Sequence, residues 1–183
     1  TVFKKDDLAY SYVLHQDSDN DIWVGTWGRG LLRLAEDFCS SSGYVKYDTA
    51  TADGETLLDE VIYAINDVDG YILVGGQKGF SIIDRESEDT RFFAPGTSEN
   101  SLPYNQVNTI LVTANGNVYL GLYGGGMCSV ADKVIPYAVD PLSEIRRRFG
   151  TNTVHGIFAS DSSWIWMGIP DNGFELYDPV SHK

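Results

Sequence analysis

Four segments of the chain repeat one pattern of short apolar runs separated by glycines. One glycine ends an apolar run, at positions 25, 75, 121 and 168, and a second lies in the turn that follows, at positions 30, 79, 126 and 173. Successive spacings are 50, 46 and 47 residues for the first set and 49, 47 and 47 for the second. A period of this length indicates one structural unit used several times in succession.

Each unit is predicted to be β rather than α. Its apolar runs are short, rich in Val, Ile, Tyr and Trp, and bounded by Gly, Asn or Asp, as expected for strands. Asp69-Gly70 and Asn115-Gly116 are strong hairpin signals, because both residue types tolerate positive φ. An outer strand is predicted at 44–47, 90–93 and 134–137, and Pro136 in the last of these suits an edge strand.

We therefore expect an all-β fold of four four-stranded antiparallel sheets, as in the blades of a β-propeller. A solenoid is the alternative, but parallel β-helix coils lack such hairpin turns. The chain is expected to be a single propeller segment (1–183), with blades at approximately 12–47, 61–93, 107–137 and 154–178, and with 1–5 as the outer strand of a preceding or closing blade.

The repeat is uneven at its ends, since the fourth unit lacks an outer strand after Tyr177. The units either close into a ring or form part of a larger propeller, and we favour the larger propeller. Open blade faces bury poorly. The expected partners are therefore further propeller blades or a second copy in a homodimer.

The segment 140–150 departs from the β pattern and is predicted to be a short helix between the third and fourth blades. Asp140 can cap it, Pro141 suits its first turn and Gly150 ends it. Its three arginines suit the C-terminal end of a helix dipole, which we prefer over an anion site.

Composition limits the partners of the chain. The net charge is −13, from 26 acidic and 13 basic residues among 183, so a phosphate backbone would be repelled and no nucleic acid is expected to bind. No apolar run approaches the length of a membrane span. Cys39 and Cys128 are far apart and outside any metal-binding spacing, so two buried thiols are expected and their redox state stays open.

The first copy reads Gln16-Asp17-Ser18-Asp19-Asn20-Asp21-Ile22-Trp23-Val24-Gly25-Thr26, followed by Gly30-Leu31-Leu32-Arg33-Leu34. In these residues it resembles the two-component regulator propeller repeat. The connection 96–107 also looks like the inter-blade segment of that family. The other copies depart from the pattern, with Leu73 and Tyr119 where tryptophan is usual, whereas the fourth keeps Trp166.

This resemblance implies a sensory role. Similar propellers form the periplasmic sensor region of hybrid two-component systems in Bacteroidetes, as part of an inner-membrane protein, and detect oligosaccharides released from glycans. A protein-interaction propeller without a small ligand is the alternative reading, and a propeller enzyme acting on polysaccharide is a third.

A ligand is expected on the face where the turns between the second and third strands gather. Loops on a rigid scaffold commonly carry binding residues. Sugars stack on aromatic rings, and planar polar groups read their hydroxyls. The candidate ligand-binding residues have these chemistries: Trp27, Arg29, Gln77, Tyr123 and Asn172. For Trp27 and Tyr123, packing between blades is the alternative.

Two further residue pairs are interpreted as structural. Trp23 and Trp166 lie in the middle of strands and are expected in the core. His15 and His155 are expected at equivalent depths in inner strands, where packing is preferred over a role at the channel.

No catalytic residue, metal ligand or cofactor is predicted. The acidic run Asp17–Asp21 begins like a calcium loop, but Ile22 and Gly28 stand where that loop needs glycine and glutamate. A polar turn is the preferred interpretation. Nucleophile, zinc and phosphate-loop motifs are absent from the sequence.

Overall fold

The computed structural model describes residues 10–34, 43–49, 57, 59–96, 101–130, 153–160, 164–170 and 173–181. The chain divides into two compact units, 1–92 and 93–183. Every element in the described ranges is a strand, and the strands form four antiparallel sheets. This confirms the predicted all-β blade architecture. The predicted strands at 1–5 and 134–137 and the predicted helix at 140–150 lie outside the described residues.

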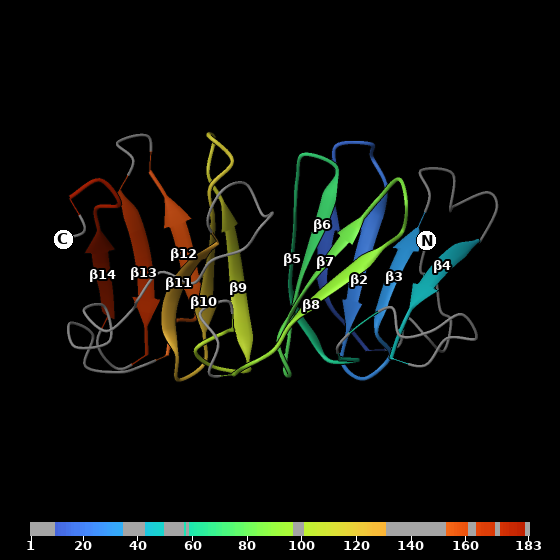
Figure 1. The fold of residues 1–183 in the computed structure, drawn as a ribbon, viewed down its shortest axis with the longest axis horizontal. Helices are drawn as coiled ribbons and strands as arrows, with labels where there is room; N and C mark the ends of the chain where they lie inside the picture. Colours follow the sequence, from blue (N-terminus) through green and yellow to red (C-terminus); the bar gives the residue numbers. More distant parts are fainter. Residues whose placement is uncertain are drawn as a thin grey trace. The chain divides into compact units, whose positions relative to one another are not determined.

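The first unit contains two four-stranded sheets (Figure 1). Blade 1 consists of β1 (Ser11–Gln16), β2 (Ile22–Thr26), β3 (Leu31–Leu34) and β4 (Tyr44–Tyr47). Blade 2 consists of β5 (Ile62–Val68), β6 (Tyr71–Gly76), β7 (Phe80–Asp84) and β8 (Thr90–Phe93). In both blades each strand is hydrogen-bonded to the next along the chain, so β4 and β8 occupy the predicted outer strands.

The second unit contains two three-stranded sheets among its described residues. Blade 3 consists of β9 (Val107–Val112), β10 (Val118–Leu122) and β11 (Gly126–Val130). Blade 4 consists of β12 (Gly156–Ala159), β13 (Ile165–Ile169) and β14 (Gly173–Tyr177). Within the described parts of the chain, no helix is long and apolar enough to cross a membrane.

The hairpin turns follow from residues that tolerate positive φ. Asp69 and Gly70 have φ values of 48° and 86°. Positive φ at both central residues is required in the two-residue hairpin turn whose twist matches that of the flanking strands. At Asn115-Gly116 only the glycine has positive φ, 83°, and the turn is longer, because the amide of Thr113 donates to the carbonyl of Asn117.

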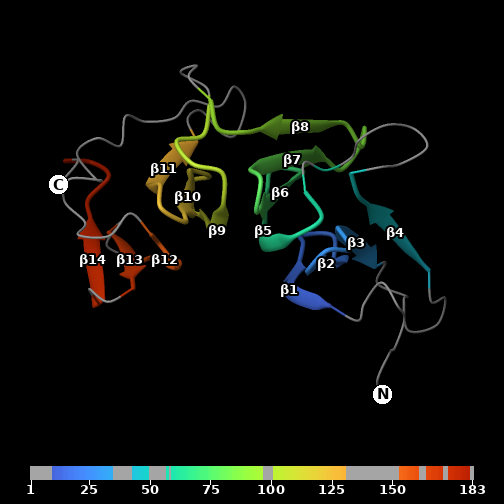
Figure 2. The same ribbon diagram turned by 90° about the horizontal axis from the view of Figure 1, so that it is seen from below.

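Blades 1 and 2 pack face to face through an apolar cluster. In blade 1 the cluster includes Trp23, Leu31 and Tyr47, and in blade 2 it includes Ile65 and Val74, all at most 8% exposed. Strands β1 and β2 lie against β5, as Figure 2 shows from below. Since side chains alternate between the faces of a strand, each blade offers one face to each neighbour.

The glycine one residue before the end of the second strand of a blade allows this close approach. A Cβ on Gly25 would lie 2.5 Å from Val13 Cγ1 and 2.6 Å from Ile62 Cγ2 of blade 2. In the second unit, a Cβ on Gly121 would lie 2.5 Å from Thr109 Cγ2 and 3.0 Å from Val154 Cγ1. The periodic glycines at 25 and 121 therefore mark contacts with the next blade rather than turns.

Blade 4 packs on blade 3 through one face only. Tyr119 and Met127 of blade 3 meet Ile165 and Met167 of blade 4 in a buried cluster. Trp166 points away from that cluster and is 38% exposed. The expectation that both motif tryptophans are core is thus confirmed for Trp23, which is 0% exposed, and wrong for Trp166.

The two histidines of the inner strands are not equivalent, contrary to expectation. His15 lies in β1 opposite Trp23, and its Nε2 lies 2.7 Å from Asp67 Oδ1 of blade 2. His155 precedes β12, and its amide donates to the carbonyl of Gly168. The prediction is wrong because β12 pairs with β13 in a register that places Phe158, not His155, opposite the motif tryptophan.

Candidate ligand-binding site

Three aromatic side chains of the first unit form one cluster, here called the aromatic platform. Tyr12 comes from β1, Trp27 follows β2, and Tyr63 comes from β5 of the next blade. The ring centroids are 5.8 Å apart for Tyr12 and Trp27, 5.8 Å for Tyr12 and Tyr63, and 5.5 Å for Trp27 and Tyr63. Tyr12 is 60% exposed and Trp27 is 53% exposed. The platform therefore joins two blades and presents aromatic surface to solvent.

The two tyrosines reach the platform because each occupies a β-bulge. Ser11 pairs with Thr26 and Val13 with Gly25, which leaves Tyr12 as an extra residue. The same irregularity between Ile62 and Ala64 leaves Tyr63 extra in blade 2. A bulge redirects a side chain at the rim of a sheet, so one local device places both rings.

Trp27 is held in place by the connection that enters blade 2. It forms an isolated β-bridge with Val61, and the amides of Gly28 and Gly30 both donate to the carbonyl of Glu60, at 2.9 and 3.0 Å. The amide of Gln77 donates to the carbonyl of Val61 at 3.2 Å. The backbones of Trp27 and Gln77 therefore flank the same residue.

A buried carboxylate lies beside the platform. Asp59 is 5% exposed, and its Oδ1 accepts from the amides of Glu60 and Val61, while its Oδ2 has no hydrogen-bond partner. Burial, together with the negative charge of Asp59, raises the pKa of the Tyr63 hydroxyl. At neutral pH Tyr63 therefore keeps its proton, and its hydroxyl can act as a donor.

The corresponding positions of the second unit carry amides rather than a ring cluster. Asn108 occupies the bulge of β9, accepts from Gln106 Nε2 at 2.9 Å and donates through Nδ2 to the carbonyl of Val154 at 3.1 Å. Tyr123 follows β10 and is 50% exposed, and its amide donates to the carbonyl of Gln106. This end of the second unit is thus a hydrogen-bonded network with one exposed ring.

The structure brings some of the predicted site residues together. Trp27 and Gln77 lie on either side of Val61, and Arg29 is exposed in the same turn as Trp27. Tyr123 lies in the other compact unit, and Asn172 lies outside the described residues.

Sequence reasoning missed Tyr12 and Tyr63. A signal was present, because they precede the strand-end glycines at 25 and 75 by 13 and 12 residues. The same aromatic residue type at matching places in two copies points to a shared role that the motif alone does not reveal.

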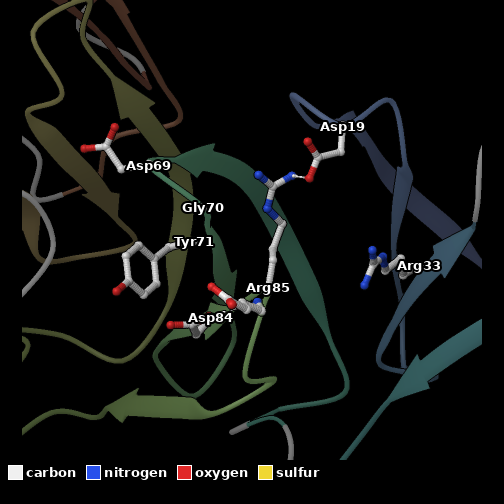
Figure 3. A pocket seen from close by; sticks show the side chains of 8 residues that line it. Asp19, Arg33, Asp69, Gly70, Tyr71, Asp84 and Arg85 are labelled. Atoms are coloured by element: carbon white, nitrogen blue, oxygen red, sulfur yellow. Dashed lines mark hydrogen bonds and ion pairs between the residues drawn. The ribbon is translucent and has the colours of Figure 1, made fainter.

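At the other end of the strands, blades 1 and 2 meet in a charged pocket of about 370 Å³. Figure 3 shows Arg85 reaching Asp19, with Arg33, Asp69, Tyr71 and Asp84 around the same space. Arg85 Nη1 lies 2.8 Å from Asp19 Oδ2 and 3.1 Å from Asp17 Oδ2. Arg33 Nε lies 2.6 Å from Asp21 Oδ2. Because both guanidinium groups are already paired with carboxylates, this pocket is a contact between blades and not a candidate anion site.

Asp17 is the centre of that contact. Its Oδ1 accepts from the amides of Asp19 and Asp21, and its Oδ2 accepts from the Trp23 indole at 2.8 Å. Burial opposes ionisation of Asp17, but the bonds from Trp23, Arg85 and these amides outweigh it and hold its pKa below the ordinary value. The acidic run is thus a polar turn, as predicted, that fastens the motif tryptophan and the next blade.

Among the residues that the structure describes, no group of three or more His, Cys, Asp or Glu side chains could hold a metal ion. Cys128 is buried in β11, and Cys39 lies outside the described ranges.

Comparison with solved structures identifies the fold. The extracellular domain assigned to a hybrid two-component system of B. thetaiotaomicron matches with a TM-score of 0.73 and 16% identity, over 98% of this chain and 24% of that one. A second such domain from the same organism gives 0.75 and 17%, over 95% and 24%. PorZ, a surface component of the type-IX secretion system of Porphyromonas gingivalis, gives 0.72 and 16%, over 96% and 27%.

The chain spans about a quarter of the length of these structures. At such low identity the likeness shows the fold alone. No curated protein sequence matches the chain. The sequence model named "Two component regulator propeller" matches residues 7–28, which include the first copy's acidic turn and motif tryptophan. The chain therefore consists of β-propeller blades, and its first copy is a two-component regulator propeller repeat.

Proposed function

We propose that this chain is a ligand-sensing segment of a periplasmic propeller in a hybrid two-component regulator, and that it binds glycan-derived oligosaccharides without turnover. The observation that supports this most directly is the aromatic platform. Its exposed rings, Tyr12 and Trp27, offer flat apolar surfaces of the kind on which the C–H faces of sugar rings stack.

The geometry of the platform favours a saccharide over a cationic ligand. An aromatic cage for an alkylammonium group needs open space between its rings. Here all three ring pairs have centroids within 5.8 Å, two of them edge to face, so the rings fill the space between one another. Ligand contact is left to their outer surfaces, which suits a flat ring.

Polar groups around the platform could read sugar hydroxyls. Arg29 and Gln77 are exposed beside Trp27, and the Tyr63 hydroxyl keeps its proton at neutral pH. The net charge of −13 disfavours strongly anionic glycans. We therefore expect neutral oligosaccharides to bind best, with Trp27 as the main contact. Tyr123 and Asn172 are proposed as ligand-binding residues of the second unit.

We also propose that the four blades belong to one propeller segment that further blades continue. Blade 4 exposes Phe158, Trp166 and Phe174 on the face that in blade 1 is covered by blade 2. A further blade is the occupant that this equivalence favours. A second copy of the chain would instead appear as a dimer in sedimentation.

Titration calorimetry against a panel of neutral and acidic oligosaccharides tests the function. Trp27→Ala is expected to weaken binding about tenfold, because losing one well-placed aromatic contact costs roughly 1–2 kcal/mol. Gln77→Ala should weaken it by a smaller factor. Trp164→Ala is the matched control, since Trp164 is 39% exposed and lies outside the platform.

Three results would overturn the proposal in different ways. Binding that Trp27→Ala leaves unchanged would remove the platform as the site. A stable protein partner with no saccharide binding would identify an interaction propeller. Release of shortened sugars during incubation would identify an enzyme.

A further inference from the structure

The turn between β10 and β11 contains three consecutive glycines, Gly124, Gly125 and Gly126. Gly124 and Gly126 have positive φ, 80° and 73°, so the turn conformation accounts for these two. Gly125 lies outside that region of φ, and blade 1 has Arg29 at the same place of its turn. The conformation of the turn therefore does not explain why residue 125 is a glycine.

The side chain of Tyr104 lies over this turn. A Cβ on Gly125 would lie 2.6 Å from Tyr104 Cβ and 2.8 Å from Leu122 Cδ1, and a Cβ on Gly124 would lie 3.2 Å from Tyr104 Cζ. At Gly28, the equivalent of Gly124 in blade 1, a Cβ would meet no atom within 4 Å. The tyrosine thus runs along the backbone of both glycines, which have no side chain to push it away.

The ring of Tyr104 lies with one face on Gly124. The three atoms nearest to a Cβ on Gly124 are Cζ, Cε1 and Cε2 of the ring, at 3.2, 3.3 and 3.6 Å, and the hydroxyl oxygen is not among them. If the tip of the ring pointed at Gly124, that oxygen would be the nearest atom. Tyr104 is 42% exposed, so its opposite face and its edge are open to solvent.

The same place in the connection that enters blade 2 carries a buried side chain. Tyr104 precedes β9 by three residues, as Asp59 precedes β5. Asp59 is 5% exposed, and its Oδ1 accepts from the amides of Glu60 and Val61. A side chain that only fastens the connection is thus buried at this place, whereas the tyrosine ring extends onto the turn and remains exposed.

Polar groups surround the exposed ring. The amide of Tyr123, which is 50% exposed, donates to the carbonyl of Gln106 at 2.9 Å. Gln106 Nε2 donates to Asn108 Oδ1, and Asn108 Nδ2 donates to the carbonyl of Val154. Each of these two bonds uses one N–H of a side-chain amide. Gln106 Oε1 and the second N–H of Asn108 therefore remain to be offered to a ligand two to four residues from Tyr104.

We propose that Tyr104 is a saccharide-stacking residue of the second unit, with Tyr123 next to it and the amides of Gln106 and Asn108 reading the hydroxyls of the stacked sugar. An aromatic face held on glycine backbone loses little conformational freedom when a ligand binds. The C–H face of a pyranose fits such a flat apolar surface, and its hydroxyls fit planar amides. The site rests on the proposed function, because it assigns a further contact to the same class of ligand.

Two substitutions of Tyr104 separate stacking from packing on the turn. Tyr104→Leu still covers the glycines with an apolar side chain but has no flat face, and Tyr104→Phe keeps the face and loses only the hydroxyl. Both are made in the Trp27→Ala chain, so that the aromatic platform does not dominate the signal. The probes are cellotetraose, xylotetraose, maltotetraose and mannotetraose, with binding measured by calorimetry and by saturation-transfer NMR on irradiation of the aromatic protons.

At least one of these tetrasaccharides is expected to bind to the Trp27→Ala chain. Tyr104→Leu should weaken that binding about tenfold, as loss of one well-placed aromatic contact does, and should reduce saturation transfer to the sugar C–H protons. Tyr104→Phe should leave both nearly unchanged. Gln106→Ala, which keeps the ring and the turn, should weaken binding several-fold. The matched control is Phe174→Ala, which removes a 65% exposed ring from β14 of the same unit and should have no effect.

Circular dichroism with urea denaturation checks that each variant is folded. Equal binding by the leucine and phenylalanine variants would mean that Tyr104 only packs on the turn, and unchanged binding by Gln106→Ala would remove the amides from the site. If Trp27→Ala abolishes all binding, the second-unit site fails and the proposed function stands. If the original chain binds none of the probes, both fail. If only the second-unit variants reduce binding, Tyr104 stands and the platform falls.

Discussion

Blades 1 and 4 both keep the motif tryptophan at the same place in the sheet, yet the two side chains have opposite environments. Trp23 lies opposite His15 and Arg33, and Trp166 lies opposite Phe158 and Leu176. Trp23 is 0% exposed and Trp166 is 38% exposed. Side chains alternate between the two faces of a strand, and this alternation places each indole on one face of its blade. Whether the indole is buried depends on whether another blade packs on that face.

The contacts of the two indoles show what a neighbouring blade adds. Trp23 lies 5.5 Å from the ring of Tyr47 and beneath Arg33, at 5.7 Å, and its nitrogen donates to Asp17, which Arg85 of blade 2 also contacts. Trp166 contacts Phe174 at 5.3 Å, and Phe174 is itself 65% exposed. The same motif residue is therefore an anchor in one blade and an open surface in the other.

The largest expected effect comes from removing each tryptophan. Trp23→Ala should lower the free energy of unfolding of the first unit by about 3–5 kcal/mol, because it leaves a cavity and removes the indole hydrogen bond to Asp17. Trp166→Ala should cost about 1 kcal/mol or less in the second unit, since a partly exposed side chain is lost. Urea denaturation followed by circular dichroism, with hydrogen exchange to resolve the units, measures both.

Equal losses in the two variants would break the comparison, because Trp166 would then be as firmly packed as Trp23. The conservative variants Trp23→Phe and Trp166→Phe serve as controls. The first should still be destabilising through the lost indole bond to Asp17, and the second should be nearly neutral.

A smaller contrast is expected at the strand-end glycines. Gly25→Ala places a Cβ 2.6 Å from Ile62 Cγ2 of blade 2, and such overpacking should cost about 1–3 kcal/mol. At Gly168 the atoms nearest to a new Cβ belong to Gly156 and lie 3.8 Å away or more. Gly168→Ala should therefore change stability by less than about 0.5 kcal/mol, as measured by urea denaturation.

The same prediction can be tested at a glycine of the second unit. Gly121→Ala meets Val154 of blade 4 at 3.0 Å and should behave like Gly25→Ala. If all three variants were neutral, the periodic glycines would not be needed for close packing of blades. If Gly168→Ala alone were costly, blade 4 would have a neighbour on its open face.

Most of the fold could be predicted because it depends on residue patterns that are local in the sequence. Strand length, alternation and the Asp69-Gly70 turn depend on neighbouring residues, and the outer strands β4 and β8 lie where their sequences predict. The environment of Trp166 could not be predicted, because it depends on which blade packs beside it. The packing role of Gly25 could not be predicted either, because Ile62, whose side chain leaves no room for a Cβ at this position, is far away in the sequence.

The candidate site was predictable only in part for a similar reason. Trp27 and Gln77 stand in turns that the glycine period identifies, so their place on one face follows from the repeat. Tyr12 and Tyr63 lie inside predicted strands. The direction of their side chains depends on β-bulges, which are visible only in the pairing register of β1 with β2 and of β5 with β6.

The smallest expected effect concerns the bond that joins Trp23 to the next blade. Asp17→Asn keeps one oxygen for the amides of Asp19 and Asp21, but its NH2 group replaces the oxygen that accepts from the Trp23 indole, and the charge that attracts Arg85 is lost. A hydrogen bond to a charged group is worth about 1.5 kcal/mol or somewhat more, so the first unit should lose about that much at neutral pH. Comparing this loss with that of Trp23→Ala separates the stability that the Asp17 contacts contribute from the stability that burial of the Trp23 ring contributes.

The pKa shift of Asp17 determines at which pH the stability difference between the original chain and Asp17→Asn should be present. The folded-state pKa of Asp17 is lowered, so its contribution is complete above the unfolded-state pKa of about 3.9 and is lost as pH falls through the folded value. The difference between the original chain and Asp17→Asn should persist at about pH 5 and shrink towards about pH 3. Asp89→Asn, at an exposed carboxylate, is the matched control and should show no such difference. A gap that stayed constant into acid would mean that the Asp17 charge adds nothing, and that packing alone distinguishes blade 1 from blade 4.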